Sequence, residues 1–374
     1  MRYTPRLALP VLISTLFLAS GVHAQSNATF YGVFDVGMEH FNHASPNGSG
    51  VTRMTTIASS VPSLIGVRGS EDLGNGLKAT FVLENGFAPG QGTAMQNGRL
   101  FGRQSTLGLR GSWGQIDFGR QWTTTFQAVI DSNVIGPAAF SIGALDGYIP
   151  NARVDNSISY YGTFNGLTIG GVYSLGRDTM RAGNCGGEQK GRACTAWSAL
   201  VKYSTDQWGV TAAYDELRGG PGAHPITVIA GAPGVAFNHS GDKDQRYYLN
   251  GYVKLANIKI GSGWLHRNIE TDTRSLHTNL YYIGASLPII QNLTLDGQFF
   301  HMDNPSYDTR ARLLVLRANY AFSKRTTAYI SVGHIENRGD GPAYSVSASS
   351  PTAIKPPKPG QNQTGTLIGL RYVF

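Results

Sequence analysis

The final ten residues, Gly365-Thr366-Leu367-Ile368-Gly369-Leu370-Arg371-Tyr372-Val373-Phe374, alternate between two kinds of side chain. One set is apolar and ends in aromatic rings, and it consists of Thr366, Ile368, Leu370, Tyr372 and Phe374. The set between them includes two glycines and an arginine. Successive residues of a strand point to opposite faces. The stretch therefore predicts a strand with one apolar face.

The same alternation recurs along the chain, for example at 167–174, 208–215, 247–255, 293–299 and 314–322. Each run has about ten residues, the length that a tilted strand needs to cross a bilayer. We count about 16 runs, an even number, and a closed barrel of that size encloses an aqueous lumen. The second face carries charged residues: Lys78, Glu84, Asp215, Lys254, Asp296 and Arg317.

A soluble β-sandwich or β-helix also alternates, so alternation alone does not decide between these classes. Aromatic residues grouped at the ends of the runs favour the membrane barrel, because aromatic girdles mark both membrane interfaces. Such pairs are Phe81 and Phe87, Tyr320 and Phe322, and Tyr372 and Phe374. After residue 24 no stretch offers the roughly 18 uncharged apolar residues of a spanning helix.

The connections between runs alternate in length. Short turns occur at 74–76, 112–114, 165–166 and 323–325, and their Gly, Asn and Ser residues suit hairpins. Long polar links lie near 42–61, 177–195, 218–243 and 337–362. Short turns on one side and long loops on the other are typical of an outer-membrane barrel.

The N-terminus has the pattern of a secretory signal peptide. Arg2 and Arg6 precede the apolar stretch 7–18, and Val22-His23-Ala24 is a small-x-small cleavage site. The alternative, an N-terminal anchor helix, needs about 20 apolar residues. We therefore expect a signal peptide at 1–24 and one barrel domain at 25–374.

Removal of the signal peptide lowers the formal charge from +8 to +6. The basic residues form no long runs, which argues against a nucleic-acid partner and favours a basic pore or an anionic partner. The two cysteines, Cys185 and Cys194, flank a polar, glycine-rich segment. In an exported protein such a pair predicts a disulfide that closes a loop. The segment has no His or Asp to complete a metal site, and we expect no cofactor.

Enzymatic motifs are absent from the sequence: it contains no G-x-S-x-G, no H-E-x-x-H and no Walker pattern. His266 and Asp272 are interpreted as rim or loop residues rather than as a catalytic pair. We therefore expect no enzyme, and a lipase or protease on a barrel remains the alternative.

A series of motifs, in order along the chain, resembles the Gram-negative general porins of the β-proteobacterial type. The series comprises 28–37 (ATFYGVFDVG), 66–79 (GVRGSEDLGNGLKA), 83–87 (LENGF), 99–104 (RLFGRQ), 111–121 (GSWGQIDFGRQ), 155–160 (DNSISY) and 371–374 (RYVF). The resemblance implies an outer-membrane, homotrimeric, 16-stranded antiparallel barrel. It would form a water-filled channel for passive diffusion of ions and small hydrophilic solutes.

The resemblance also implies that the third long loop, about 122–153, folds into the barrel and narrows it. Asp131 and Asp146 are the only carboxylates in this loop, and its middle, 134–140, is apolar. Packing against the lumen wall would explain that composition. The alternative is a short helix or tucked turn without a role in the pore.

Charges on facing walls of the constriction would set the selectivity. Arg120 matches the wall arginine of the family, and Arg68 and Glu84 match basic and acidic wall positions. Arg103 and Arg153 are further candidates. Position 64, polar or basic in many relatives, is leucine here, and the loop lacks a clear acidic motif. We therefore expect a weak preference for anions.

Two rival functions remain open. A substrate-specific channel would share the fold, with tyrosines as a possible sugar slide: Tyr31, Tyr161, Tyr248, Tyr252 and Tyr282. A surface adhesin or receptor would use the cysteine-containing loop at 177–195 and the proline-rich loop at 337–362.

Overall fold

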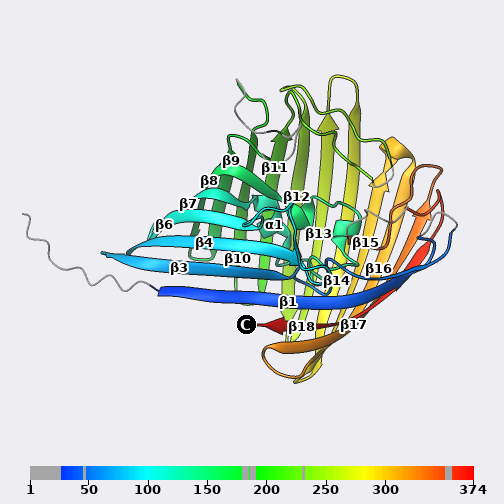
Figure 1. Ribbon diagram of the computed structural model, residues 1–374, viewed down its shortest axis with the longest axis horizontal. Coiled ribbons are helices and arrows are strands. Elements are labelled where there is room, and N and C mark those ends of the chain that lie inside the picture. Colours follow the sequence, from blue (N-terminus) through cyan, green and yellow to red (C-terminus); the bar gives the residue numbers. More distant parts are fainter. Residues whose placement is uncertain (1–26, 45–47, 179–184, 186–190, 230–231, 350–355) are drawn as a thin grey trace, which may run out of the picture.

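The computed structural model describes residues 27–374, apart from 45–47, 179–184, 186–190, 230–231 and 350–355. The signal-peptide prediction at 1–24 lies outside the described residues. Sixteen long strands form one antiparallel sheet, and β1 (Asn27–Phe41) pairs with both β3 (Leu64–Gly74) and β18 (Gln363–Val373), which closes the barrel (Figure 1). The predicted fold class is therefore confirmed.

The other long strands follow in order around the wall (Figure 1). They are β4 (Leu77–Ala88), β6 (Gln104–Gly111), β7 (Gly114–Trp122), β8 (Arg153–Phe164), β9 (Leu167–Ser174), β10 (Ala196–Ser204), β11 (Trp208–Arg218), β12 (Lys243–Leu255), β13 (Ile258–Glu270), β14 (Ser275–Ile290), β15 (Leu293–Asn304), β16 (Thr309–Ala321) and β17 (Thr326–Arg338). Two short strands, β2 (Val51–Met54) and β5 (Thr93–Ala94), belong to long loops. Among the described residues no helix is long and apolar enough to cross a membrane.

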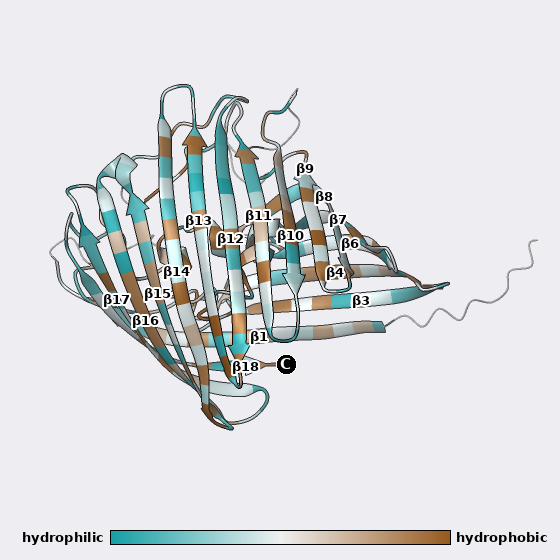
Figure 2. Ribbon diagram, turned by 180° about the vertical axis from the view of Figure 1, so that it is seen from behind, coloured by the Kyte–Doolittle hydropathy of each residue, from teal (hydrophilic) through white to brown (hydrophobic). Residues whose placement is uncertain are grey.

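The apolar face of the strands points outward. In β18, Ile368 is 59 % exposed, whereas its neighbour Leu367 is 2 % exposed and faces the interior. Figure 2 shows the same alternation of hydropathy along the other strands. A soluble sandwich would bury its apolar faces against each other, so the exposed apolar band excludes that alternative.

Aromatic pairs lie at both ends of the apolar band. On the side of the short turns, the rings of Phe30 and Phe374 lie 5.6 Å apart, and Tyr320 contacts Phe322. On the side of the long loops, Tyr214 packs on Trp197, with ring centroids 4.7 Å apart, and on Tyr247. These pairs form the two interfacial girdles expected of a membrane barrel.

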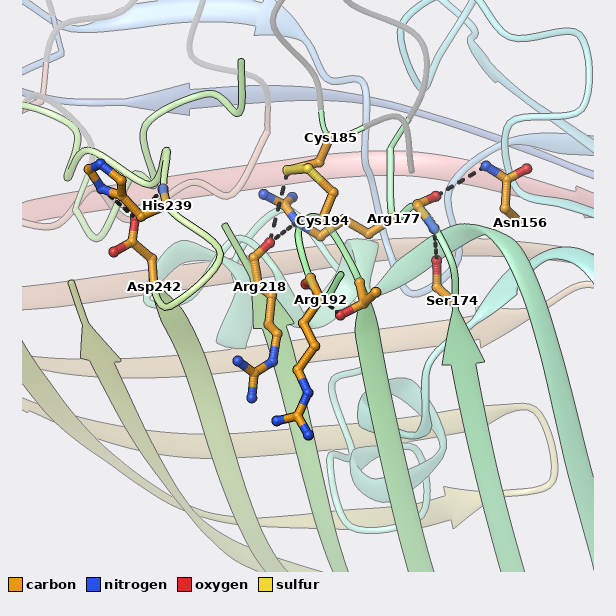
Figure 3. Close-up of a disulfide and its surroundings, with 11 residues drawn as sticks. Asn156, Ser174, Arg177, Cys185, Arg192, Cys194, Arg218, His239 and Asp242 are labelled. Carbon is orange, nitrogen blue, oxygen red and sulfur yellow. Dashed lines mark hydrogen bonds and ion pairs between the residues drawn. A yellow bond between two sulfur atoms is a disulfide. The ribbon is translucent and has the colours of Figure 1, made fainter. Parts of the chain in front are cut away.

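The four predicted short turns join β3 to β4, β6 to β7, β8 to β9 and β16 to β17. The opposite side carries eight connections: L1 (42–63), L2 (89–103), L3 (123–152), L4 (175–195), L5 (219–242), L6 (271–274), L7 (305–308) and L8 (339–362). L2 is long but was absent from the predicted set, although Pro89-Gly90 signals a break. In L4 the predicted disulfide joins Cys185 to Cys194 (Figure 3).

L3 folds into the barrel, as predicted, and contains α1 (Thr124–Val129) and two short helices, η1 (Ile142–Ala144) and η2 (Ile149–Asn151). Its apolar side chains are buried against the inner wall, and they include Ile135, Ala139, Phe140, Ile142, Leu145 and Ile149. This burial explains the apolar middle of the loop.

Glycines of the wall make room for L3. A Cβ atom at Gly261 of β13 would lie 2.0 Å from the carbonyl oxygen of Ser132. Added Cβ atoms at Gly333 and Gly365 would lie within 3 Å of the Phe140 ring. Only glycine permits such an approach, because any side chain would collide with the loop.

Candidate pore constriction

Four arginines converge on the part of the wall from which L3 departs. Arg99 and Arg103 belong to L2, Arg120 lies near the end of β7, and Arg153 begins β8. We call this set the arginine wall. Three of its members were predicted site residues, and Arg99 was not.

A register shift between β7 and β8 places Arg120. The shift lies between Gly119 and Gln121, where Gly119 has a φ of +126° and Asn156 a φ of +48°. Such bulges redirect side chains at the ends of strands. Arg120 Nε donates to the carbonyl oxygen of Gly102 at 2.8 Å, and its Nη1 lies 2.5 Å from Asp155 Oδ1. The positive φ of Gly119 at this bulge explains why the Gly-Arg-Gln motif begins with glycine.

Arg99 joins two carboxylates at the same wall. Its Nη2 lies 2.8 Å from Asp155 Oδ2 and 2.7 Å from Asp178 Oδ1 of L4. Asp155 therefore bridges Arg99 and Arg120. Two arginines and two carboxylates thus balance one another in this cluster, which joins L2 to β8 and L4.

Arg153 stands on the face of Trp122, with its guanidinium carbon 3.4 Å from the ring centroid. The arginine is 6 % exposed. Its Nε and Nη1 are buried and have no hydrogen-bond partner among the described residues. A buried guanidinium without a carboxylate is costly, although the cation–π contact offsets part of the cost.

Glu84 is the predicted acidic wall residue, and the structure places it beside Arg103. Arg103 Nε donates to Glu84 Oε2 at 3.1 Å, and the Tyr31 hydroxyl donates to Glu84 Oε1 at 2.8 Å. Arg68 lies over the Tyr31 ring at 4.9 Å and remains exposed to the lumen. Arg68, Tyr31, Glu84 and Arg103 thus form one connected group.

A cavity of about 520 Å³ lies between the arginine wall and the returning segment of L3. Its charged lining consists of Arg99, Arg120, Arg153, Arg177 and Asp178. Gly147, Tyr148 and Asn151 of L3 complete the opposite side. Asp178 lines the cavity and Asp155 pairs with two of its arginines, so four arginines against these two carboxylates still give the cavity a positive potential.

The two carboxylates of L3 contact other walls. Asp131 pairs with Lys202 of β10. Asp146 is 4 % exposed and lies 3.0 Å from Arg246 Nε and 3.8 Å from Arg267 Nη1. Burial would raise the pKa of Asp146, but the two guanidinium groups and the hydrogen bonds outweigh it, so the pKa lies below its usual value.

The pairing continues along the same wall. Arg246 also lies 3.1 Å from Asp244, and Arg267 holds Asp244 through two bonds of 2.8 Å. Further round, Arg317 pairs with Asp296 at 2.7 Å and donates to the carbonyl oxygen of Ile135 at 2.8 Å. We call Asp146, Asp244, Arg246 and Arg267 the loop clamp, because these ion pairs attach L3 to β12 and β13.

Comparison with known proteins decides the family. A family model for Gram-negative porins matches residues 8–340. The chain belongs to the Gram-negative porin family. It is an outer-membrane porin, as the sequence predicted, and it forms a channel.

Its relatives agree with this assignment. The porin is 28 % identical to outer membrane porin protein 32 of Delftia acidovorans, over 97 % of this chain and 99 % of that one. It is 28 % identical to an outer membrane porin protein of Bordetella pertussis, with 73 % of this chain and 76 % of the relative covered. A solved structure named "Anion-selective porin from Comamonas acidovorans" matches with a TM-score of 0.77 and 23 % identity, over 94 % of this chain and 100 % of that one.

The porin also contains charged residues that sequence reasoning did not select. Asp155 belongs to the 155–160 motif, and Arg177 and Asp178 lie in a predicted loop. Arg246 and Arg267 occupy inward positions of their strands, so the alternation could have indicated them. Of the proposed tyrosine slide, Tyr248 and Tyr282 are each 3 % exposed and lie beneath L3, so these two tyrosines do not line an open path.

Proposed function

We propose that this porin passes small hydrophilic solutes and ions with a preference for anions. The observation that carries the proposal is Arg153, a buried guanidinium without a carboxylate partner in the described chain, at the edge of a cavity lined by three other arginines. An anion that enters the cavity lowers the electrostatic cost of this charge, whereas a cation raises it.

We propose that L3, over 122–153, narrows the lumen, and that Arg68, Glu84, Arg103, Arg120 and Arg153 line the passage beside it. Asp131 and Asp146 would contribute little to the field across the pore, because Lys202, Arg246 and Arg267 contact them directly. The acidic side of the field is then Glu84, Asp155 and Asp178, and all three have arginine partners.

The relatives support the same reading. One similar solved structure is named as anion-selective. Another, from Vibrio cholerae, is described in a trimer form, with a TM-score of 0.64 and 14 % identity over 93 % of this chain and 99 % of that one. We propose a homotrimer in contact with outer-membrane lipid and a channel without catalytic activity.

Reversal potentials in a salt gradient across planar bilayers test the preference. We expect the wild-type potential to indicate anion permeability above cation permeability, and Arg153→Gln to lower that ratio. Arg110→Gln is the matched control, because Arg110 lies at the turn end of β6 and outside the cavity. A wild-type preference for cations, or an equal effect of both variants, would contradict the proposal.

A further inference from the structure

Three potential metal ligands meet where L5 approaches L6. They are His239 and Asp242 of L5 and Asp272 of L6. His239 Nδ1 lies 3.1 Å from Asp272 Oδ2 and 3.9 Å from Asp242 Oδ2. All three ligand atoms lie within 4.8 Å of one another. Figure 3 shows the imidazole of His239 beside the carboxylate of Asp242.

Asp242 is unusual for a loop carboxylate because it is only 1 % exposed. Its Oδ2 accepts the backbone N–H of His239 at 2.9 Å. Its Oδ1 is buried and has no hydrogen-bond partner in the described part of the chain. Burial of an anionic oxygen without a donor or cation is costly, so the Asp242 carboxylate, whose other oxygen lies 3.9 Å from His239 Nδ1, favours a bound cation.

The backbone around Asp242 is held in place. Its N–H donates to the carbonyl oxygen of His239 at 3.1 Å, and its carbonyl oxygen accepts the N–H of Gly219 at 3.1 Å. L5 thus closes on itself at its base, which fixes the backbone position of Asp242. Among the described residues, His239 is the only basic side chain in an ion pair with Asp242 or Asp272.

The set of donors indicates the class of ion. One imidazole and two carboxylates suit Zn²⁺ and related first-row metals, whereas Mg²⁺ and Ca²⁺ favour oxygen ligands alone. Bonds of about 2.0–2.1 Å in a tetrahedral site separate the ligand atoms by roughly 3.3 Å. The observed separations of 3.1 and 3.9 Å lie close to this value.

We propose that His239, Asp242 and Asp272 form a site for a divalent transition metal, with Zn²⁺ as its reference ligand and a fourth position open to water. The ion neutralises the two carboxylates and joins L5 to L6. L5 also supplies His224 to Thr227, which line a cavity at the channel mouth. Metal binding therefore restrains one side of the entrance.

Isothermal titration of Zn²⁺ into the refolded, tag-free porin in detergent tests the site. We expect one Zn²⁺ per chain and a rise in the thermal midpoint with Zn²⁺. His239→Gln, Asp242→Asn and Asp272→Asn should each weaken binding by more than about tenfold. Far-UV circular dichroism and the midpoint without metal establish that each variant is folded.

Two controls separate this site from other histidines. His224→Gln changes another L5 histidine, and His277→Gln changes a strand histidine whose ring lies 6.4 Å from that of His266. Both variants should bind Zn²⁺ like the wild type. The proposal is overturned if Zn²⁺ at about millimolar concentration does not bind, or if binding survives His239→Gln or is lost in His277→Gln. If the cluster is only a histidine–carboxylate ion pair, Zn²⁺ will not bind, which is the first of these results.

Discussion

Arg153 and Arg246 are both buried arginines of the barrel interior, yet their surroundings differ. Arg246 is 0 % exposed and lies within 3.1 Å of Asp146 and of Asp244. Arg153 is 6 % exposed and contacts an aromatic ring, but no carboxylate within ion-pair distance among the described residues. The loop clamp therefore uses its charges to hold L3, whereas Arg153 of the arginine wall would, on the proposed function, offer its charge to a passing ion.

The largest effect on stability is expected from Arg246→Met. It leaves Asp146 and Asp244 with less compensation in a buried site, which costs about 3–5 kcal/mol. The thermal midpoint of the detergent-solubilised porin should fall, and the single-channel conductance should rise as L3 loosens. Arg310→Met is the matched control: its pair with Asp303 is exposed and contributes about 1 kcal/mol or less. An equal loss in both variants would remove the distinction between clamp and surface pair.

Acidification should weaken the same clamp by a smaller amount. The folded-state pKa of Asp146 lies below the unfolded value, so its contribution is complete above the unfolded pKa and is lost as pH falls through the folded pKa. Thermal midpoints measured from neutral pH to about pH 3 should fall less steeply in Asp146→Asn than in the wild type. Asp131→Asn is the control, because Asp131 contacts Lys202 at a partly exposed site. Identical profiles for Asp146→Asn and the wild type would contradict this role.

Gly365→Val tests the packing of L3 rather than its charges. The added side chain would collide with the Phe140 ring, and overpacking of this kind costs about 1–3 kcal/mol. The double variant with Phe140→Ala should recover part of the loss, which a double-mutant cycle measures. Gly171→Val is the control, because a Cβ there meets nothing closer than 3.6 Å. Additive effects at 365 and 140 would show that the two residues are not coupled.

The smallest effect on stability is expected from Arg153→Met. Removal of a buried charge without a carboxylate partner is neutral or stabilising when the new side chain fills a similar volume. The free energy of unfolding should change by no more than about 0.5 kcal/mol, the range of surface substitutions, so the thermal midpoint should hardly move. The reversal potential should nevertheless move towards cation permeability. A loss of stability like that of Arg246→Met would show that Arg153 has a structural partner.

The strands and their faces could be predicted because alternation is a local property. Ile368 and Leu367 already differ by parity, and a closed barrel is the only sheet that can expose the apolar set to lipid. The partners of Asp146 could not be predicted in this way. Arg246 and Arg267 lie about a hundred residues further along the chain, and they meet Asp146 only because L3 runs along that wall.

The arginine wall falls between these two cases. Arg103, Arg120 and Arg153 could be selected by resemblance, and Gly119 hints at the bulge that redirects Arg120. Which of these arginines keeps a free guanidinium depends on the positions of Glu84 and Asp155. Those positions follow from strand register and from L2, which carry no simple signal in the sequence.

The seating of L3 also bears on the closure of the barrel. β1 and β18, the first and last strands, meet at the seam of the barrel, and L3 contacts both sides of it. Ala139 N–H donates to Ala58 of L1 at 3.0 Å, and Phe140 lies against Gly365 of β18. L3 cannot complete these contacts while the seam is open. The closed seam and the seated L3 therefore stabilise each other, and the inward-folded loop reinforces the junction between the first and last strands.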